Sequence, residues 1–266
     1  LNSKNRKHNV AIICERIKMQ KIIKFILLAI CLIVFIYSAY KIYAYLKEEN
    51  ASKQFANELI EKAVTEIPDE KIYTNDITNE YKSPLDIDFE VLNQENQDIV
   101  GWIYLENSPI NYPVVQSNDN DYYLHRLING EYNLAGSIFM DYRNNSNLED
   151  NNTIIYGHNM KNNTMFGSLQ EYKAQEYYEN HKTIYYFTPE KNYAIELIAG
   201  YTISVESDIY NLADIDKKEL TDIISKSDFT SDIELKENDK LITLSTCAYE
   251  YDGARYVVIG ILKEIS

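Results

Sequence analysis

The sequence is poor in glycine, proline and cysteine, and these shortages limit the classes of protein that it could encode. Its 266 residues include eight glycines, five prolines and three cysteines, and they contain no internal repeat and no low-complexity tract. Repeat proteins and low-complexity chains are therefore excluded. With 45% hydrophobic and 25% charged residues, the composition is that of a globular protein with one or two domains and a sizeable core.

Positive charge is scarce after the first 46 residues. The chain holds 26 basic and 41 acidic residues, of which eight basic residues and one acidic residue lie in 1–46. The remainder therefore has 18 basic and 40 acidic residues, a net charge of −22. A surface this acidic repels phosphate backbones, which excludes nucleic acid as a partner.

One long uncharged segment lies near the N-terminus. Residues 25–40 read FILLAICLIVFIYSAY, and they reach the roughly 20 residues of a spanning helix if Lys24 and Lys41 extend their ammonium groups to the interfaces. Lysines cluster just before this segment, so the positive-inside rule places the N-terminus in the cytoplasm. We expect a cytoplasmic leader over 1–21, a single-pass anchor in the cell membrane over 22–46, and an extracytoplasmic remainder.

Two alternatives concern this N-terminal segment. A cleaved signal peptide also contains an apolar run, but no small-x-small cleavage site follows here, and the tyrosine-rich flanks favour an uncleaved anchor. Met19 opens a second natural start, MQKIIKFILLAI, and under that alternative residues 1–18 would not be translated. The expected topology is the same with either start.

The cysteines are placed so that no disulfide is expected outside the membrane. Cys14 lies before the expected anchor, Cys31 lies inside it, and Cys247 is the one thiol of the external part. A lone external thiol is a liability unless it is used, which makes Cys247 a candidate reactive group. The alternative is a buried, inert cysteine that packs as a small hydrophobic residue.

Residues 47–97 are expected to form N-terminal helices and a linker. Apolar positions at helical spacing predict a helix over 47–66, and the polar stretch that follows suits a linker. A second short helix is predicted over 88–97, with Asp86 or Asp88 as its N-cap.

Residues 98–266 have the texture of a mostly β domain. Short segments rich in Tyr, Ile, Thr and Val alternate with turn signals, and so many short strands imply a closed barrel or a sandwich. Two helices are expected to interrupt them, over 164–181 and, between the sixth and seventh strands, over 213–226. The eight strands are expected at 99–105, 110–115, 137–141, 153–157, 183–188, 192–203, 240–247 and 255–263.

A cysteine, an arginine and a histidine lie at strand ends in the pattern of a catalytic site. Cys247 ends one strand and Arg255 begins the next, so antiparallel pairing would bring them together. A guanidinium there can favour the thiolate and donate hydrogen bonds to an oxyanion. His158, at a strand end in IIYGHN, could act as the general acid and base. The ordinary alternatives are a solvated arginine and a surface histidine; His125 and His181 fit the latter, since no nucleophile cue accompanies them.

Taken together, these motifs resemble the sortase family. TLSTC at 243–247, with Arg255 opening the next strand, is similar to the sortase signature, and YGHN at 156–159 resembles the segment around the sortase histidine. The segments 98–124 and 136–144 resemble class B sortases in particular. The resemblance covers most of the external part and implies a closed eight-stranded sortase-type β-barrel with N-terminal helices.

Carried over position by position, the resemblance implies a set of roles. Cys247 would be the nucleophile, His158 the acid and base, and Arg255 the group that orients substrate and stabilises the oxyanion. Ser245 matches a substrate-contacting position of class B sortases, and Asn120 matches a segment that lines the groove for the sorting signal.

Leu124 matches the same groove-lining segment, with core packing as its alternative role. The sequence also departs from the family pattern just after the cysteine, where class B sortases often carry an acidic residue. Ala248 and Tyr249 stand there instead, so no Cys–His–Asp triad is assigned.

The reaction implied by the resemblance is acyl transfer without a metal or an organic cofactor. A C-terminal sorting signal of a secreted surface protein, of NPxTx or LPxTG-like sequence, would be cleaved after Thr. The acyl group would pass through a thioacyl enzyme to an amine of the peptidoglycan precursor. The alternatives are another extracytoplasmic cysteine acyl enzyme that acts on peptidoglycan, such as an L,D-transpeptidase or papain-like peptidase, and a non-catalytic wall-binding barrel. Within the family, the housekeeping and pilin-polymerising classes remain alternatives to class B.

Overall fold

The computed structural model describes residues 2–67, 82–210, 217–248 and 250–265. The chain divides into two compact units, residues 1–50 and residues 51–266. Each unit is described by itself.

Helix α1 (Asn2–Ala63) forms the whole described part of the first unit and continues into the second. No glycine or proline occurs within its bounds, so nothing in the sequence interrupts the helical hydrogen bonds. The predicted helix over 47–66 is therefore the last part of a longer helix, and it ends at Ala63 because β1 (Val64–Glu66) pairs with β2 (Leu85–Ile87). Most of the predicted linker lies outside the described residues.

The first unit meets the physical requirements of a membrane span. Within Lys18–Ala63 an 18-residue window has a mean hydropathy of 2.7, and none of that window is buried by other parts of the protein. Apolar side chains of the predicted anchor such as Phe25, Leu28 and Phe35 are more than half exposed. The helix is therefore a candidate membrane span by length and composition.

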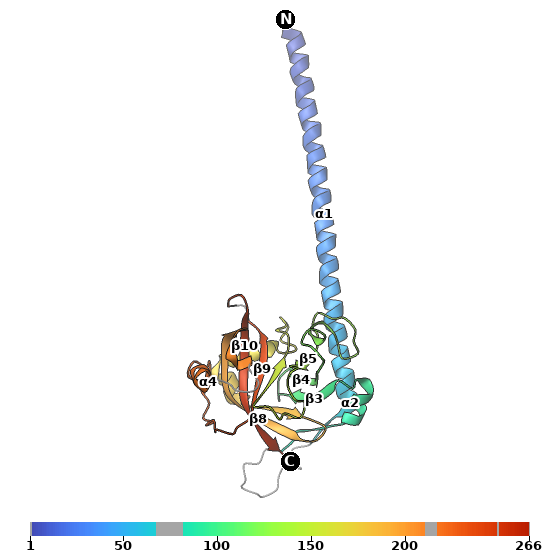
Figure 1. Cartoon of the computed structure of the whole chain (residues 1–266). Coiled ribbons are helices and arrows are strands. Elements are labelled where there is room, and N and C mark those ends of the chain that lie inside the picture. Colours follow the sequence, from blue (N-terminus) through green and yellow to red (C-terminus); the bar gives the residue numbers. More distant parts are fainter. Residues whose placement is uncertain (1, 68–81, 211–216, 249, 266) are drawn as a thin grey trace. The chain divides into compact units, whose positions relative to one another are not determined.

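The second unit is a closed barrel of eight strands, as predicted (Figure 1). Its strand order is β10-β8-β7-β3-β4-β5-β6-β9, and all neighbours are antiparallel except the pairs β4–β5 and β6–β9, which are parallel. The strands agree with the predicted segments to within two residues. They are β3 (Ile99–Tyr104), β4 (Asn111–Val115), β5 (Ile138–Met140), β6 (Asn152–Tyr156), β7 (Thr183–Phe187), β8 (Asn192–Ser204), β9 (Leu241–Cys247) and β10 (Ala254–Ile265).

Alternation along the strands separates an interior core from two outer clusters. Ile242 and Leu244 of β9 belong to the core inside the barrel, whereas Leu241 belongs to an outer cluster covered by α4 (Lys217–Ser225). A second outer cluster, around Trp102, is covered by the end of α1 and by α2 (Phe89–Glu95). Cys247 continues the odd-numbered, outward series of β9, so its side chain belongs to the outer face of the barrel.

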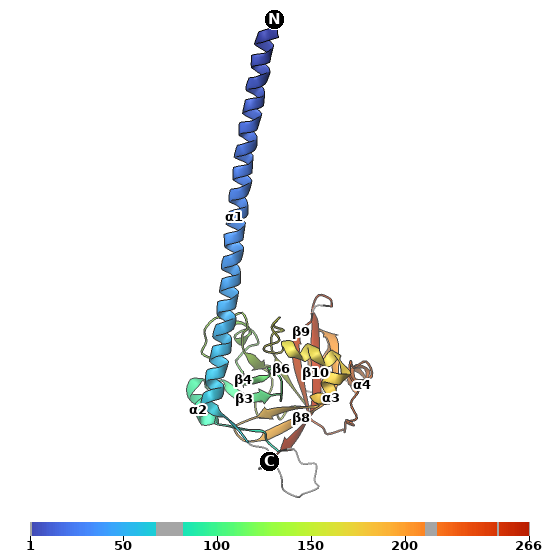
Figure 2. The ribbon, with the colours of Figure 1, turned by 180° about the vertical axis from the view of Figure 1, so that it is seen from behind.

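The helical segments agree with the predictions only in part. Asp88 caps α2 by accepting a hydrogen bond from the Val91 backbone N–H at 3.0 Å, as expected for one of the two candidates. The predicted helix over 164–181 is instead a 3₁₀ segment, η3 (Gly167–Lys173), and a short helix, α3 (Gln175–Asn180), separated by the extended residue Ala174. This segment lies over β10, which η3 contacts (Figure 2). The first residues of the predicted helix over 213–226 lie outside the described residues.

Two further 3₁₀ turns frame the outer face where β6 and β9 end. They are η2 (Tyr123–His125), between β4 and β5, and η4 (Asp208–Tyr210), between β8 and β9. Neither was predicted from the sequence, because each is a single turn held by contacts from distant segments.

Candidate active site

Strand pairing brings Cys247 and Arg255 together. The two residues are direct partners in the antiparallel register of β9 and β10. The loop between them closes with a hydrogen bond from the Ala248 N–H to the Ala254 carbonyl at 3.0 Å. The Arg255 guanidinium is turned partly to its own strand, since its Nη1 donates to the Ala254 carbonyl at 2.9 Å. Cys247 is half-buried, so its thiol is neither sealed in the core nor fully exposed.

His158 reaches the same place from β6, which runs parallel to β9. The Gly157 N–H extends the pairing by donating to the Ser245 carbonyl at 3.1 Å, and Asn159 Nδ2 donates to the Cys247 carbonyl at 2.7 Å. His158 is therefore held between two residues that bond directly to the strand of the cysteine. Gly157 favours this approach, because a Cβ there would lie 2.7 Å from Cγ of the buried Phe166 ring.

The imidazole of His158 has a fixed orientation. Its Nε2 lies 2.6 Å from the Leu124 carbonyl oxygen, which can only accept a hydrogen bond. Nε2 therefore carries a proton, and Nδ1 is the atom that can gain or lose one. Burial lowers the pKa of His158 from its ordinary value, and the bond to Leu124 opposes this shift. The positive charges of His125 and Arg255 lower the pKa further.

The predicted residues line one cavity of about 450 Å³ on the outer face of the barrel. Tyr156 and Phe139 contribute aromatic surface, so the cavity has apolar walls and a reactive end. Such a groove can hold an extended peptide with one carbonyl near the thiol. The lining includes all six predicted site residues, namely Asn120, Leu124, His158, Ser245, Cys247 and Arg255.

The three predicted substrate-contacting residues are all in the groove, but their polar groups already have partners. The Ser245 hydroxyl lies 2.8 Å from the Tyr210 hydroxyl. Asn120 donates to Asp141 at 3.1 Å and accepts from the Tyr142 N–H at 3.0 Å. Leu124 lines the groove and also packs partly against an outer cluster, so its position fits both the expected substrate contact and the alternative of core packing.

A network beside the groove was not found by sequence reasoning. Asp141 is fully buried, and its carboxylate accepts two bonds from Arg143 at 2.8 Å and one from Tyr156 at 2.9 Å. Burial acts to raise the pKa of Asp141, but the bonds from these groups hold it below its ordinary value. Arg143 also donates to the Tyr210 carbonyl at 3.2 Å, which ties η4 to the groove. The sequence cue that could have predicted the Asp141–Arg143 pair is the D-x-R spacing in MDYRN.

Tyr210 forms the wall of the groove on the η4 side. It lies between Tyr156, with ring centroids 6.3 Å apart, and Ser245. Burial raises the pKa of Tyr210 to about 12, so its phenol stays protonated and can donate at neutral pH. No signal in the local sequence marks this residue, because only the fold brings it to β9.

His125 lies against the catalytic candidate, although the sequence around it offers no catalytic cue. Its ring stacks on that of His158, with centroids 5.4 Å apart and planes inclined by 17°. His181 stacks instead on Tyr177 in α3, away from the groove lining. Within the described part of the chain, no group of His, Cys, Asp or Glu could hold a metal ion.

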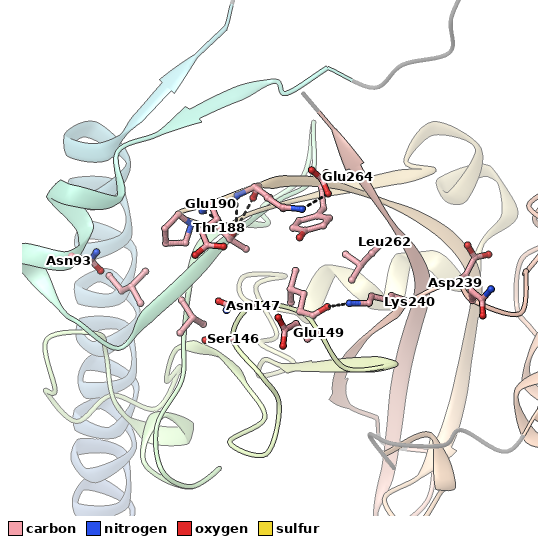
Figure 3. A pocket seen from close by; sticks show the side chains of 17 residues that line it. Asn93, Ser146, Asn147, Glu149, Thr188, Glu190, Asp239, Lys240, Leu262 and Glu264 are labelled. Carbon is pink, nitrogen blue, oxygen red and sulfur yellow. Dashed lines mark hydrogen bonds and ion pairs between the residues drawn. The ribbon is translucent and has the colours of Figure 1, made fainter.

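A larger cavity of about 700 Å³ lies at the opposite ends of the same strands (Figure 3). Its lining includes Lys240, just before β9, and Leu262, near the end of β10. Lys191 pairs with Glu264 at 2.7 Å, and Lys240 donates to the Leu148 carbonyl at 3.0 Å. Its described lining residues include neither a cysteine nor a histidine, whereas the smaller groove is lined by both Cys247 and His158.

Comparisons with known proteins identify the family of the chain. A family model described as the Sortase domain matches residues 103–263. Sortase B of Listeria monocytogenes is 35% identical over 235 residues, which covers 85% of this chain and 91% of that protein. Sortase B of Staphylococcus aureus is 37% identical over 185 residues, which covers 67% and 75% of the two chains.

Solved structures of class B sortases share the fold. Sortase B from B. anthracis, in complex with AAEK1, has a TM-score of 0.67 and 34% identity, and the match covers 82% of this chain and 99% of that chain. The Staphylococcus aureus sortase B–substrate complex has a TM-score of 0.63 and 34% identity, with 67% and 86% covered. The chain therefore belongs to the sortase family of cysteine transpeptidases, and within that family to class B.

Proposed function

We propose that Cys247, His158 and Arg255 carry out the transpeptidation of a sorting-signal peptide bound in the outer groove. The observation that supports this most directly is that all three line one cavity, with Cys247 and Arg255 paired in the strand register. A solved complex of Staphylococcus aureus sortase B with its substrate supports a peptide as the ligand class.

The first half-reaction cleaves the peptide. The Cys247 thiolate attacks the carbonyl carbon of the threonine in an NPxTx or LPxTG-like signal and forms a C–S bond. The C–N bond of the scissile peptide then breaks, and the leaving amine takes a proton from imidazolium Nδ1 of His158. The product is a thioacyl enzyme and a free C-terminal fragment. Nδ1 is the proton donor because the Nε2 proton is hydrogen-bonded to the Leu124 carbonyl.

The second half-reaction joins the surface protein to the cell wall. An amine of a peptidoglycan precursor attacks the thioester carbonyl and gives its proton to His158 Nδ1. The C–S bond breaks, and the thiolate returns. Arg255 supplies hydrogen bonds to the oxyanion in both steps, after its guanidinium leaves the Ala254 carbonyl to which it now donates. Neither step needs a metal or an organic cofactor.

The rest of the groove is proposed to position the peptide. Ser245, Asn120 and Leu124 lie along its walls, and Tyr210 faces the Ser245 hydroxyl. We propose that Ser245 and Asn120 also form hydrogen bonds with the peptide. A hydroxyl and an amide can each bond to several groups, so their present partners do not use all of their donors and acceptors.

The proposed topology is a single-pass anchor with the catalytic domain outside the cell. Residues 1–21 would lie in the cytoplasm, 22–46 would cross the membrane, 47–97 would connect, and 98–266 would form the catalytic barrel. The apolar helix and the lysines before its apolar core support this orientation.

A peptide assay with the full chain in detergent tests the proposal. NPxTx and LPxTG-like peptides, with a glycine peptide as the amine, should give a thioacyl adduct of the protein and a ligated product, both measured by mass spectrometry. Cys247→Ala should form neither, whereas Cys31→Ser should behave as the wild type, because Cys31 lies in the helix of the first unit.

The partners of the cysteine are tested in the same assay. His158→Ala and Arg255→Ala should each lower kcat/KM by orders of magnitude with the fold intact. Arg255→Lys should not restore activity, because an ammonium lacks the planar fork of a guanidinium. Turnover by Cys247→Ala would refute the nucleophile, and near-normal turnover by Arg255→Ala would remove the arginine from the mechanism.

A further inference from the structure

The turn η2 contacts the imidazole of His158 in two different ways. The Leu124 carbonyl oxygen accepts a hydrogen bond from Nε2 at 2.6 Å, and the ring of the next residue, His125, stacks nearly parallel to the imidazole, with centroids 5.4 Å apart. The hydrogen bond to Leu124 sets the direction in which Nε2 points, and the stack on His125 sets the plane of the His158 ring. Together they restrict the rotation that would carry Nδ1 away from its place.

The turn itself is held firmly. The Ser137 N–H donates to the Tyr123 carbonyl at 3.0 Å, and the Asn133 N–H donates to the His125 carbonyl at 3.1 Å. Gly136, at φ +59°, lets the chain pass close to the turn, since a Cβ there would lie 2.4 Å from the Leu124 oxygen. The fold therefore holds η2 in place, and with it the two contacts that η2 makes with His158.

We propose that His125 is a positioning residue of the transfer reaction, whose ring keeps the imidazole of His158 on the Leu124 carbonyl so that Nδ1 exchanges the proton. The proposal rests on the proposed role of His158 as the acid and base. His125 does not touch the reacting atoms in this scheme. The residue is exposed, and its ring also lies near that of Tyr132, with centroids 6.1 Å apart and planes inclined by 42°.

The stack also has an electrostatic consequence. His158 shares the groove lining with the charged or titratable residues Arg255, Arg143, Cys247, Tyr156 and Tyr210, and its ring stacks on that of His125 on η2. The charges of Arg255 and His125 both lower the pKa of His158, because a second positive charge opposes protonation. His125 therefore affects the pH at which His158 becomes an acid as well as its orientation.

Two substitutions separate the ring from its charge. His125→Phe keeps a flat ring and removes the charge, whereas His125→Ala removes both. The full chain in detergent, with histidine rings labelled for NMR, gives the titration midpoint of His158 directly. The pH dependence of kcat and KM for a sorting peptide gives the functional result. His181→Phe is the matched control, because it removes a stacked histidine outside the groove lining.

The expected results differ between the two variants. In His125→Phe the midpoint of His158 and the acid limb of kcat/KM should rise by about half a pH unit, and the plateau of kcat/KM should rise about threefold, because more molecules then hold an imidazolium beside a thiolate. In His125→Ala the same shift should come with a loss in kcat of roughly tenfold or more and an unchanged KM. His181→Phe should change neither quantity.

Every outcome bears on the proposal. A His125→Ala enzyme with the wild-type kcat refutes it, whether or not the midpoint shifts, as does a His125→Phe enzyme that loses as much kcat as the alanine variant. If the alanine variant does not fold, His125→Leu, which keeps an apolar side chain but lacks a flat ring, decides through its kcat. An active His158→Ala enzyme would instead refute the proposed acid and base, which is a separate failure.

Discussion

At the scale of single residues, the reactivity of this site depends on two protonation states that oppose each other. Acyl transfer as proposed needs a thiolate at Cys247 and an imidazolium at His158 in the same molecule. A thiol ordinarily ionises at about pH 8.5 and an imidazole at about pH 6.5, so the neutral pair dominates between these values. Burial lowers the pKa of His158 further, which reduces the imidazolium fraction.

This opposition predicts a bell-shaped pH dependence of kcat/KM. The rate should fall at low pH as the thiolate is lost, with an acid limb below about pH 6.5 because the pKa of His158 is lowered. It should fall at high pH as the imidazolium is lost. Initial rates on a sorting peptide between about pH 5 and about pH 10, at constant ionic strength, measure the profile. A flat profile over this range would contradict the requirement for both charged forms.

Residue types and spacing pointed to Cys247, His158 and Arg255 because each lies at or near the end of a strand. Cys247 was recognised from the TLSTC motif and His158 from the YGHN motif. Arg255 was recognised because it lies at the start of the strand that follows Cys247. Tyr210 and His125 could not be found in this way. Their contacts join residues 35 and 33 positions apart in the chain, and no local pattern marks such pairs.

At the scale of elements, the eight strands could be predicted because alternation and turn signals report burial directly. The turn η4 could not, since its position depends on bonds from outside it. Asn152 Nδ2 donates to the Ile209 carbonyl at 2.8 Å, Arg143 donates to the Tyr210 carbonyl, and the Tyr210 hydroxyl lies on Ser245. These bonds make η4 a fixed wall of the groove.

The last of these bonds can be tested alone. Tyr210→Phe removes a hydroxyl 2.8 Å from Ser245 Oγ and leaves the ring in place. We expect KM for the peptide to rise several-fold with kcat nearly unchanged, because the change alters binding along the wall and leaves the reacting atoms alone. Steady-state kinetics measure the split, and Tyr193→Phe, in the opposite cavity, is the control. A fall in kcat at constant KM would instead place the phenol in the chemical steps.

At the scale of the whole molecule, the division into two units separates the candidate membrane span from the barrel that contains the groove. Residues 51–266 contain the barrel, the groove and the last turns of α1. Leu59 and Ala63 in those turns are buried in the outer cluster with Trp102 and Phe187. The sequence pattern predicted a helix here, but not that it supports the barrel, because amphipathic spacing does not say which surface a helix covers.

Two truncations therefore differ sharply in their expected effects. A chain that begins at residue 51 loses the apolar helix and keeps the packed turns, so it should be soluble, with the melting temperature and peptide-cleaving activity of the barrel intact. A chain that begins at Val64 also loses Leu59, which is 1% exposed, and uncovers the outer cluster. Its free energy of unfolding should fall by about 3 kcal/mol or more, since burial of a leucine and its neighbours is lost.

Urea denaturation of the two chains measures the difference, and equal stabilities would mean that the end of α1 contributes nothing to the barrel. If they differ as expected, single substitution of Leu59 by alanine in the longer chain should reproduce most of the loss.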